Sequence, residues 1–155
     1  MVSKPSAAAF TLIEVLVGLG VLGGAAAAAI AALLQMNYNA NLSRLRTGAG
    51  TAVQNQIDYL LSVQPYNPQK NQVPAALEVG TQLKGSASNP TVPIYTDPVT
   101  GQVVVWGWMV TEVTDTNQTC NSVNLNLRRA NVTAFYVFRN RTYSIEMSTL
   151  RSSDI

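Results

Sequence analysis

The pattern of hydrophobic positions begins with an almost unbroken apolar run from Phe10 to Leu34, whose clearly polar members are Thr11 and Glu14. About 25 residues of helix, at 1.5 Å per residue, cover roughly 37 Å, which exceeds the roughly 30 Å hydrocarbon core of a bilayer. The run therefore predicts a helix that spans a membrane.

Apolar and small residues continue at helical spacing beyond this run, so we expect the helix to extend past the membrane. Gly48-Ala49-Gly50 indicates either a kink or a tight packing spot within it. Pro65 ends the element, because proline cannot continue a helix. The residues on the predicted face are Met36, Ala40, Leu42, Leu45, Ala49, Ala52, Val53, Gln56, Ile57, Leu60 and Leu61.

The C-terminal half of the chain alternates apolar and polar residues, which is typical of strands. A proline-rich stretch over 65–101 comes first, with short strands expected around 75–83 and 91–95. Longer strands are predicted at 102–114, 122–128, 131–138 and 141–149. The predicted fold class is α+β, with a long N-terminal helix against a four-stranded antiparallel sheet.

The predicted strand 102–114 has apolar residues on both faces, which indicates a central strand. Trp106 and Trp108 share one face of it. Their position in a hydrophobic strand favours packing in the core over an exposed stacking platform.

The composition excludes several kinds of chemistry. The chain has no histidine and one cysteine, Cys120. This removes histidine bases, histidine metal ligands, cysteine–histidine nucleophile pairs and an internal disulfide. We therefore expect no enzymatic activity, no cofactor and no metal site. The formal net charge of +2 is too small to indicate a nucleic-acid partner by itself.

Glu14 stands out because a carboxylate within a membrane-spanning helix costs roughly 2.5–3.5 kcal/mol and marks a functional site. The flank before the run carries one charge, Lys4, so we expect a cytoplasmic N-terminus and an exported C-terminal part. The run is a plain anchor, a secretory signal cut near the small residues 25–29, or a class III signal. A secretory signal leaves both Glu14 and the apolar residues up to Leu34 unexplained.

The motif Ala9-Phe10-Thr11-Leu12-Ile13-Glu14-Val15 resembles the prepilin motif of type IV pilins and type II secretion pseudopilins. The resemblance implies that prepilin peptidase cuts between Ala9 and Phe10, and that the new amine of Phe10 is N-methylated. The family usually has glycine before the cut, where this chain has Ala9. The implied organisation is a leader over 1–9, a transmembrane and polymerisation helix over 10–34, and an exported pilin head over 35–155.

The resemblance further implies that Glu14 pairs with the Phe10 amine of a neighbouring subunit in the filament. A charge in a region of low dielectric needs such a partner. The alternative is that the carboxylate of Glu14 reaches the N-terminus of its own helix, where negative charge is also favoured.

The C-terminal part has the pattern Val105-Trp106-Gly107-Trp108-Met109-Val110, then two strands, then a terminal Ser144-Ile145-Glu146-Met147-Ser148-Thr149-Leu150-Arg151. This pattern looks like the heads of PilV-type minor pilins. This implies a minor pilin or pseudopilin rather than an enzyme, with the head in the bacterial periplasm while the helix crosses the inner membrane. After assembly the subunit would lie in a pilus or pseudopilus. The implied partners are other pilins, prepilin peptidase and the inner-membrane assembly platform.

Two other functions remain open. Arginines are frequent in the last third of the chain, and if they converge they would bind DNA phosphates, as in a competence pilin. Charged, solvated strand edges are the alternative. A membrane-anchored periplasmic enzyme is disfavoured by the lack of histidine and of clustered acids. The candidate DNA-binding residues are Arg128, Arg129, Arg139 and Arg141.

Overall fold

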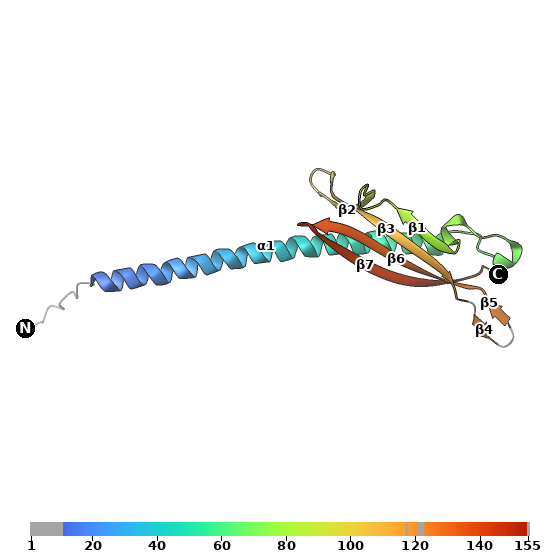
Figure 1. Ribbon diagram of the computed structural model, residues 1–155, viewed down its shortest axis with the longest axis horizontal. Helices are drawn as coiled ribbons and strands as arrows, with labels where there is room; N and C mark the ends of the chain where they lie inside the picture. Colours follow the sequence, from blue (N-terminus) through green and yellow to red (C-terminus); the bar gives the residue numbers. More distant parts are fainter. Residues whose placement is uncertain (1–10, 117, 121–122, 155) are drawn as a thin grey trace, which may run out of the picture. The chain divides into compact units, whose positions relative to one another are not determined.

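The computed structural model describes residues 11–116, 118–120 and 123–154. The chain divides into two compact units, Met1–Asn41 and Leu42–Ile155, and we refer to the second as the C-terminal unit. The helices and strands follow in the order shown in Figure 1: α1 (Leu12–Ser62), the 3-10 turns η1 (Pro68–Lys70) and η2 (Ala75–Leu77), β1 (Gly80–Lys84), β2 (Val92–Thr96), β3 (Val103–Asp115), β4 (Gln118–Cys120), β5 (Val123–Leu125), β6 (Leu127–Phe138) and β7 (Arg141–Ser152).

The helix α1 is continuous over 51 residues. It includes the glycines of the apolar run and those of the Gly48-Ala49-Gly50 segment. It ends at Ser62, three residues before Pro65. The prediction that the helix extends well beyond the apolar run is confirmed.

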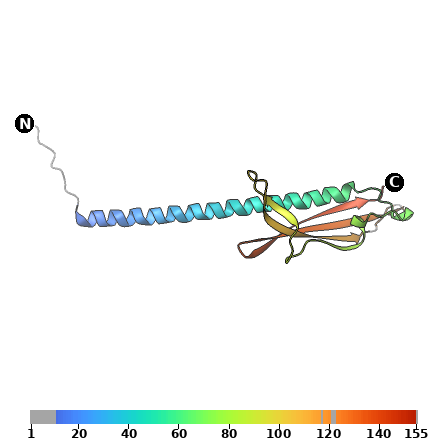
Figure 2. The same cartoon turned by 90° about the horizontal axis from the view of Figure 1, so that it is seen from above.

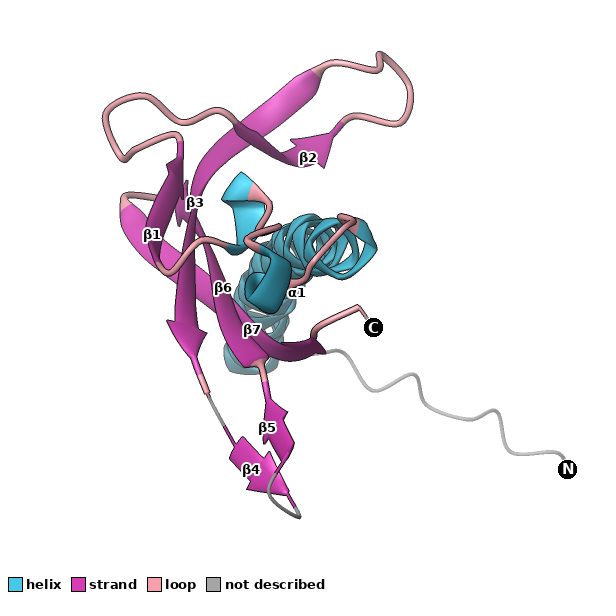
Figure 3. Cartoon of the chain, turned by 90° about the vertical axis from the view of Figure 1, so that its right-hand side faces the viewer, coloured by secondary structure: helices cyan, strands magenta, loops and turns pink. Residues whose placement is uncertain are grey.

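The C-terminal unit contains a five-stranded antiparallel sheet within the described residues. β1 and β2 pair with successive parts of one edge of β3, β6 pairs with the other edge of β3, and β7 pairs with β6. β3 is therefore a central strand, as expected. The sheet lies along one side of the C-terminal part of α1 (Figures 2 and 3).

The α+β class is confirmed, but the predicted number of four strands is wrong. Both short strands of the proline-rich stretch, β1 and β2, join the main sheet. The predicted strand 122–128 does not exist as such, since β4 and β5 form a separate two-stranded ribbon and Arg128 belongs to β6. The alternating pattern changes phase at Arg128-Arg129. Alternation by itself does not show which part of a strand pairs with which neighbour.

One face of α1 and one face of the sheet enclose the core. The buried helix residues are spaced by three or four positions, as the helical period requires. They belong to the face that the sequence predicted. They are Leu45, Ala49, Val53, Ile57 and Leu60, and they pack with Tyr66, Leu77, Val92, Ile94, Met109, Val113, Ala130, Val132, Ala134 and Tyr136.

Gly48 sets the closest approach between α1 and the sheet. A Cβ atom at Gly48 would lie 1.8 Å from the carbonyl oxygen of Ile94 on β2, a separation that no side chain can have. At Gly50 the nearest atom, the Cε of Met147, is 4.0 Å away. Since α1 is continuous here, Gly48 is a tight packing spot rather than a kink.

The turn between β6 and β7 consists of Arg139 and Asn140, which both have positive φ angles of 48° and 63°. Two such residues form the type I′ turn that matches the twist of a hairpin. Arg139 therefore lies in the turn, and Arg141 is the first residue of β7. This two-residue turn falls between the predicted strands 131–138 and 141–149.

Candidate functional site

Glu14 hydrogen-bonds to the N-terminus of its own helix. The backbone N–H of Thr11 donates to Oε2 of Glu14 at 2.9 Å, and the Thr11 hydroxyl group donates to the same oxygen at 3.0 Å. The backbone N–H of Glu14 donates to the Thr11 carbonyl oxygen at 3.1 Å. Thr-x-x-Glu is the signature of a capping box, and a Glu14 carboxylate on the N-terminus of its own helix is the alternative that the sequence left open. Ala9 and Phe10, the proposed processing residues, lie outside the described residues.

The apolar run forms an exposed hydrophobic surface. Among the described residues, α1 is the one helix that is long and apolar enough to cross a membrane. Its large apolar side chains up to Leu34 are 51–81% exposed. Contiguous apolar surface of this extent marks a region that contacts lipid or another protein.

The glycines of this segment leave room for a close neighbour. At Gly18, Gly20, Gly23 and Gly24, an added Cβ atom would meet nothing within 4 Å. Small residues spaced four apart, such as Gly20 and Gly24, allow the backbones of two membrane helices to approach closely. This surface is suited to packing against another helix.

Arg128 is engaged within the C-terminal unit. Its Nε donates to Oδ1 of Asp115 at 3.0 Å, and its Nη1 donates to the carbonyl oxygen of Leu77. The guanidinium group lies 5.5 Å from the ring centre of Tyr66, and the side chain is only 11% exposed. Arg128 is thus a structural residue with little surface to offer a DNA phosphate.

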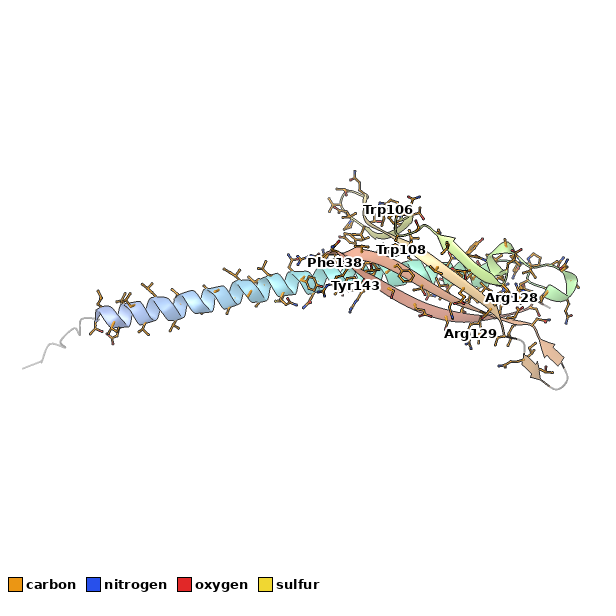
Figure 4. The ribbon with its side chains drawn as sticks, in the orientation of Figure 1. Trp106, Trp108, Arg128, Arg129, Phe138 and Tyr143 are labelled. Carbon is orange, nitrogen blue, oxygen red and sulfur yellow. The ribbon has the colours of Figure 1, made fainter. Side chains whose placement is uncertain are left out.

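The four candidate DNA-binding arginines do not form one patch. Arg128 and Arg129 lie near the start of β6, whereas Arg139 follows its last residue and Arg141 pairs with Phe138. Ten strand residues cover roughly 33 Å at about 3.3 Å per residue. Figure 4 shows Arg128 and Arg129 at the end of the sheet opposite to Phe138 and Tyr143.

The two tryptophans lie on the face of the sheet that α1 does not cover. Along β3, the buried residues are Gly107, Met109, Thr111 and Val113, and the tryptophans alternate with them. Trp106 is 46% exposed, so the expectation that it packs in the core is wrong. Trp108 is half-buried because it stacks on Phe135 of β6, with ring centres 5.4 Å apart and planes 9° apart.

A groove of about 1120 Å³ lies between α1 and the strands β1 and β2. Polar helix residues such as Thr47, Asn55 and Tyr59 form one side, and Gln82 and Lys84 lie on the other. The residues that line it include no carboxylate, histidine or cysteine. The hydroxyl groups and the lysine of the groove therefore have no carboxylate, histidine or cysteine beside them in its lining.

No group of three or more metal-ligating side chains occurs within residues 11–116, 118–120 and 123–154. In comparisons with protein-family models, curated proteins and solved structures, nothing matches this chain. The capped apolar helix and its motif are therefore the features of this chain that point to a function.

Proposed function

We propose that this protein is a minor type IV pilin or type II secretion pseudopilin, a structural subunit of a filament. Prepilin peptidase cuts it between Ala9 and Phe10, and the apolar helix then carries it into a pilus or pseudopilus. The single observation that carries the proposal is the acid at the start of an exposed, membrane-length apolar helix, in the setting of the prepilin motif.

The capping box leaves Glu14 able to bind a second partner. Both hydrogen bonds from Thr11 end on Oε2, and Oε1 has no hydrogen bond within the described part of the chain. A carboxylate accepts about four hydrogen bonds. The cap therefore holds the carboxylate in place while Oε1 can receive the amine of a neighbouring Phe10.

The open surface around Gly20 and Gly24 supports the same function, because subunits that assemble through a membrane helix need close contact between helices. The groove has no carboxylate, histidine or cysteine in its lining, which favours a structural subunit over a periplasmic enzyme. The alternative of a DNA receptor required four converging arginines, and the described residues keep Arg128 and Arg129 far from Arg139 and Arg141.

Glu14→Gln tests the proposal, because glutamine at this position still completes a capping box but carries no charge. We expect Glu14→Gln and Glu14→Ala to be exported and cleaved like the wild type, and both to be depleted from sheared filaments. Thr11→Ser is the matched control, since it keeps both the cap and the acid, and we expect normal incorporation. Glu14→Gln incorporated at the wild-type level would contradict the proposed role of the charge.

Mass spectrometry of the mature N-terminus tests processing separately. We expect a chain that begins with N-methylated Phe10. A mature chain that begins at Met1 indicates a plain anchor, and one that begins near residues 25–29 indicates a secretory signal. Either result contradicts the proposed function.

A further inference from the structure

The strand β6 runs antiparallel to α1 within the C-terminal unit, which places the β6–β7 turn where α1 enters this unit. At one end, Arg151 donates to the carbonyl oxygen of Leu60 in the last turn of α1. At the other end, Gly48 touches Ile94, and the side chain of Ile94 lies against Gly107, which pairs with Tyr136 of β6. The turn follows Tyr136 by three residues.

Four arginines gather at this end of the C-terminal unit. Arg44 and Arg46 are exposed on either side of the buried Leu45 on α1, and Arg139 and Arg141 are exposed at the β6–β7 turn. Arg46 is near enough to the hydroxyl group of Tyr136 for its charge to lower the pKa of that group, against the larger effect of burial, which raises it. We call Arg44, Arg46, Arg139 and Arg141 the basic pole.

The β2–β3 loop lies at the same end, because Thr96 pairs with Val103, four residues before Gly107 on β3. Its acid, Asp97, accepts a hydrogen bond from the backbone N–H of Val99 at 2.8 Å, so its carboxylate is engaged within the loop. Val99 itself is 90% exposed. The end of the unit thus combines positive charge with an exposed apolar side chain, the two features by which proteins bind a lipid surface.

Arg139 occupies a conformation that its residue type disfavours. Its φ of 48° lies in the left-handed region, where glycine or asparagine is less strained. A side chain without a branched Cβ tolerates this position only with backbone strain. The chain places a positive charge at the turn despite this strain.

The basic pole begins soon after the apolar run in the sequence. Arg44 comes ten residues after Leu34 in the same helix. Ten helical residues measure about 15 Å, and a headgroup layer of roughly 6 Å plus a Debye length of about 8 Å covers most of this distance. Long arginine side chains bridge the remainder by reaching toward the phosphates.

We propose that the basic pole binds anionic phospholipid headgroups of the membrane that α1 crosses, and that it holds the C-terminal unit against the bilayer before the subunit enters a filament. This inference rests on the membrane insertion that the proposed function includes. It does not depend on assembly, so the two can be tested apart.

The test uses the full chain in lipid nanodiscs, with a nitroxide label at Thr142→Cys on a Cys120→Ser background. Thr142 is exposed on β7 next to Arg141. Discs of pure phosphatidylcholine are compared with discs that also contain phosphatidylglycerol. We expect the label to lie at headgroup depth in the anionic discs alone, and salt at about 0.5 M to release it by screening.

Arg139→Gly and Arg141→Ser are the test variants. Each should lower the ratio of docked to undocked label about fivefold, as expected for the loss of one arginine at a charged bilayer surface. Arg139→Gly also relieves the positive φ, so a loss of docking cannot come from a destabilised turn. Arg129→Ser is the matched control, because Arg129 is exposed at the opposite end of β6, and it should dock like the wild type.

Equal label depth in both kinds of disc overturns the inference, as does an unchanged docked ratio in Arg139→Gly and Arg141→Ser. A short DNA duplex that shields the label in phosphatidylcholine discs would instead identify nucleic acid as the partner and overturn lipid binding. A chain that inserts into the discs but whose C-terminal unit does not dock contradicts this inference and leaves the proposed function standing. A chain that does not stay with the discs contradicts the proposed function as well.

Discussion

The guanidinium group of Arg151 donates a hydrogen bond to the carbonyl oxygen of Leu60 at 3.2 Å, which joins the last strand to the last turn of α1. Its Nη2 also donates to both carboxylate oxygens of Asp154, at 3.1 and 3.0 Å. Asp154 in turn accepts the backbone N–H of Tyr66 at 2.9 Å. Arg151 thus satisfies a helix-end carbonyl group and fixes the chain that follows α1.

We expect Arg151→Met to lower the free energy of unfolding by about 2 kcal/mol, because it leaves a buried carbonyl group and Asp154 without their charged donor. Urea unfolding of the full chain in detergent, followed by tryptophan fluorescence, measures this change. Arg141→Met is the control, because Arg141 is exposed, and it should stay within about 0.5 kcal/mol of the wild type. Equal effects of the two variants would show that the contacts of Arg151 contribute nothing.

Gly48→Ala should destabilise the C-terminal unit by more than about 2 kcal/mol, because the new methyl group would overlap the Ile94 carbonyl oxygen and force α1 away from β2. Gly50→Ala makes the same change in the same helix with space around it. It should be neutral or stabilising by up to about 1 kcal/mol through helix propensity. The same urea experiment compares them, and similar values for both variants would contradict the tight contact at Gly48.

Trp108→Leu should cost about 1 kcal/mol through the lost stack with Phe135, beyond the change in buried area. Trp106→Leu, on the same face but largely exposed, should cost less than about 0.5 kcal/mol. A double-mutant cycle of Trp108→Leu with Phe135→Leu measures the coupling directly. A coupling energy near zero would mean that the two rings only share a neighbourhood.

Because Tyr66 is buried, we expect the protein to lose stability at alkaline pH. Burial raises the pKa of its hydroxyl group above the ordinary 10.0, and this outweighs the opposing effect of the nearby Arg128. Since the folded pKa is raised, the contribution to stability is complete below pH 10.0 and is lost as the pH rises through the folded pKa. Tyr66→Phe should flatten the fall in urea midpoint above about pH 10.

Part of that alkaline fall should persist in Tyr66→Phe, because burial also raises the pKa of Tyr136. Tyr66→Phe and the wild type should have parallel stability profiles below pH 9, where both tyrosines are protonated in the folded and unfolded chain. An unchanged slope above pH 10 in Tyr66→Phe would contradict a raised pKa at Tyr66.

The sequence pattern was sufficient to predict those features that depend on a single helix or a single strand. The period of Leu45, Ala49, Val53, Ile57 and Leu60 identified the buried face of α1, because every fourth or third residue of a helix shares a side. The alternation in β3 likewise identified a central strand. The prepilin motif and the Thr11–Glu14 cap are also local, since they involve contacts within one helical turn.

Pairing between distant segments was not readable from the same pattern. The alternation predicts a strand but not its neighbour, so the separate β4–β5 ribbon was missed. Trp106 and Trp108 were assigned to the core because hydrophobic residues on both faces of a strand do not show which face a helix covers. That is decided by α1, which covers only the side of Met109 and Val113.

The sequence by itself determined that this protein has a membrane-length apolar helix with an acid at its start, followed by an α+β unit. These features follow from hydrophobicity and backbone period, which are properties of contiguous residues. Only the tertiary structure decided what each arginine does. Arg128 and Arg151 have buried or nearly buried side chains, whereas Arg44, Arg46, Arg139 and Arg141 are exposed at one end of the C-terminal unit. The reason is that the direction of β6 against α1 depends on packing between residues far apart in the chain.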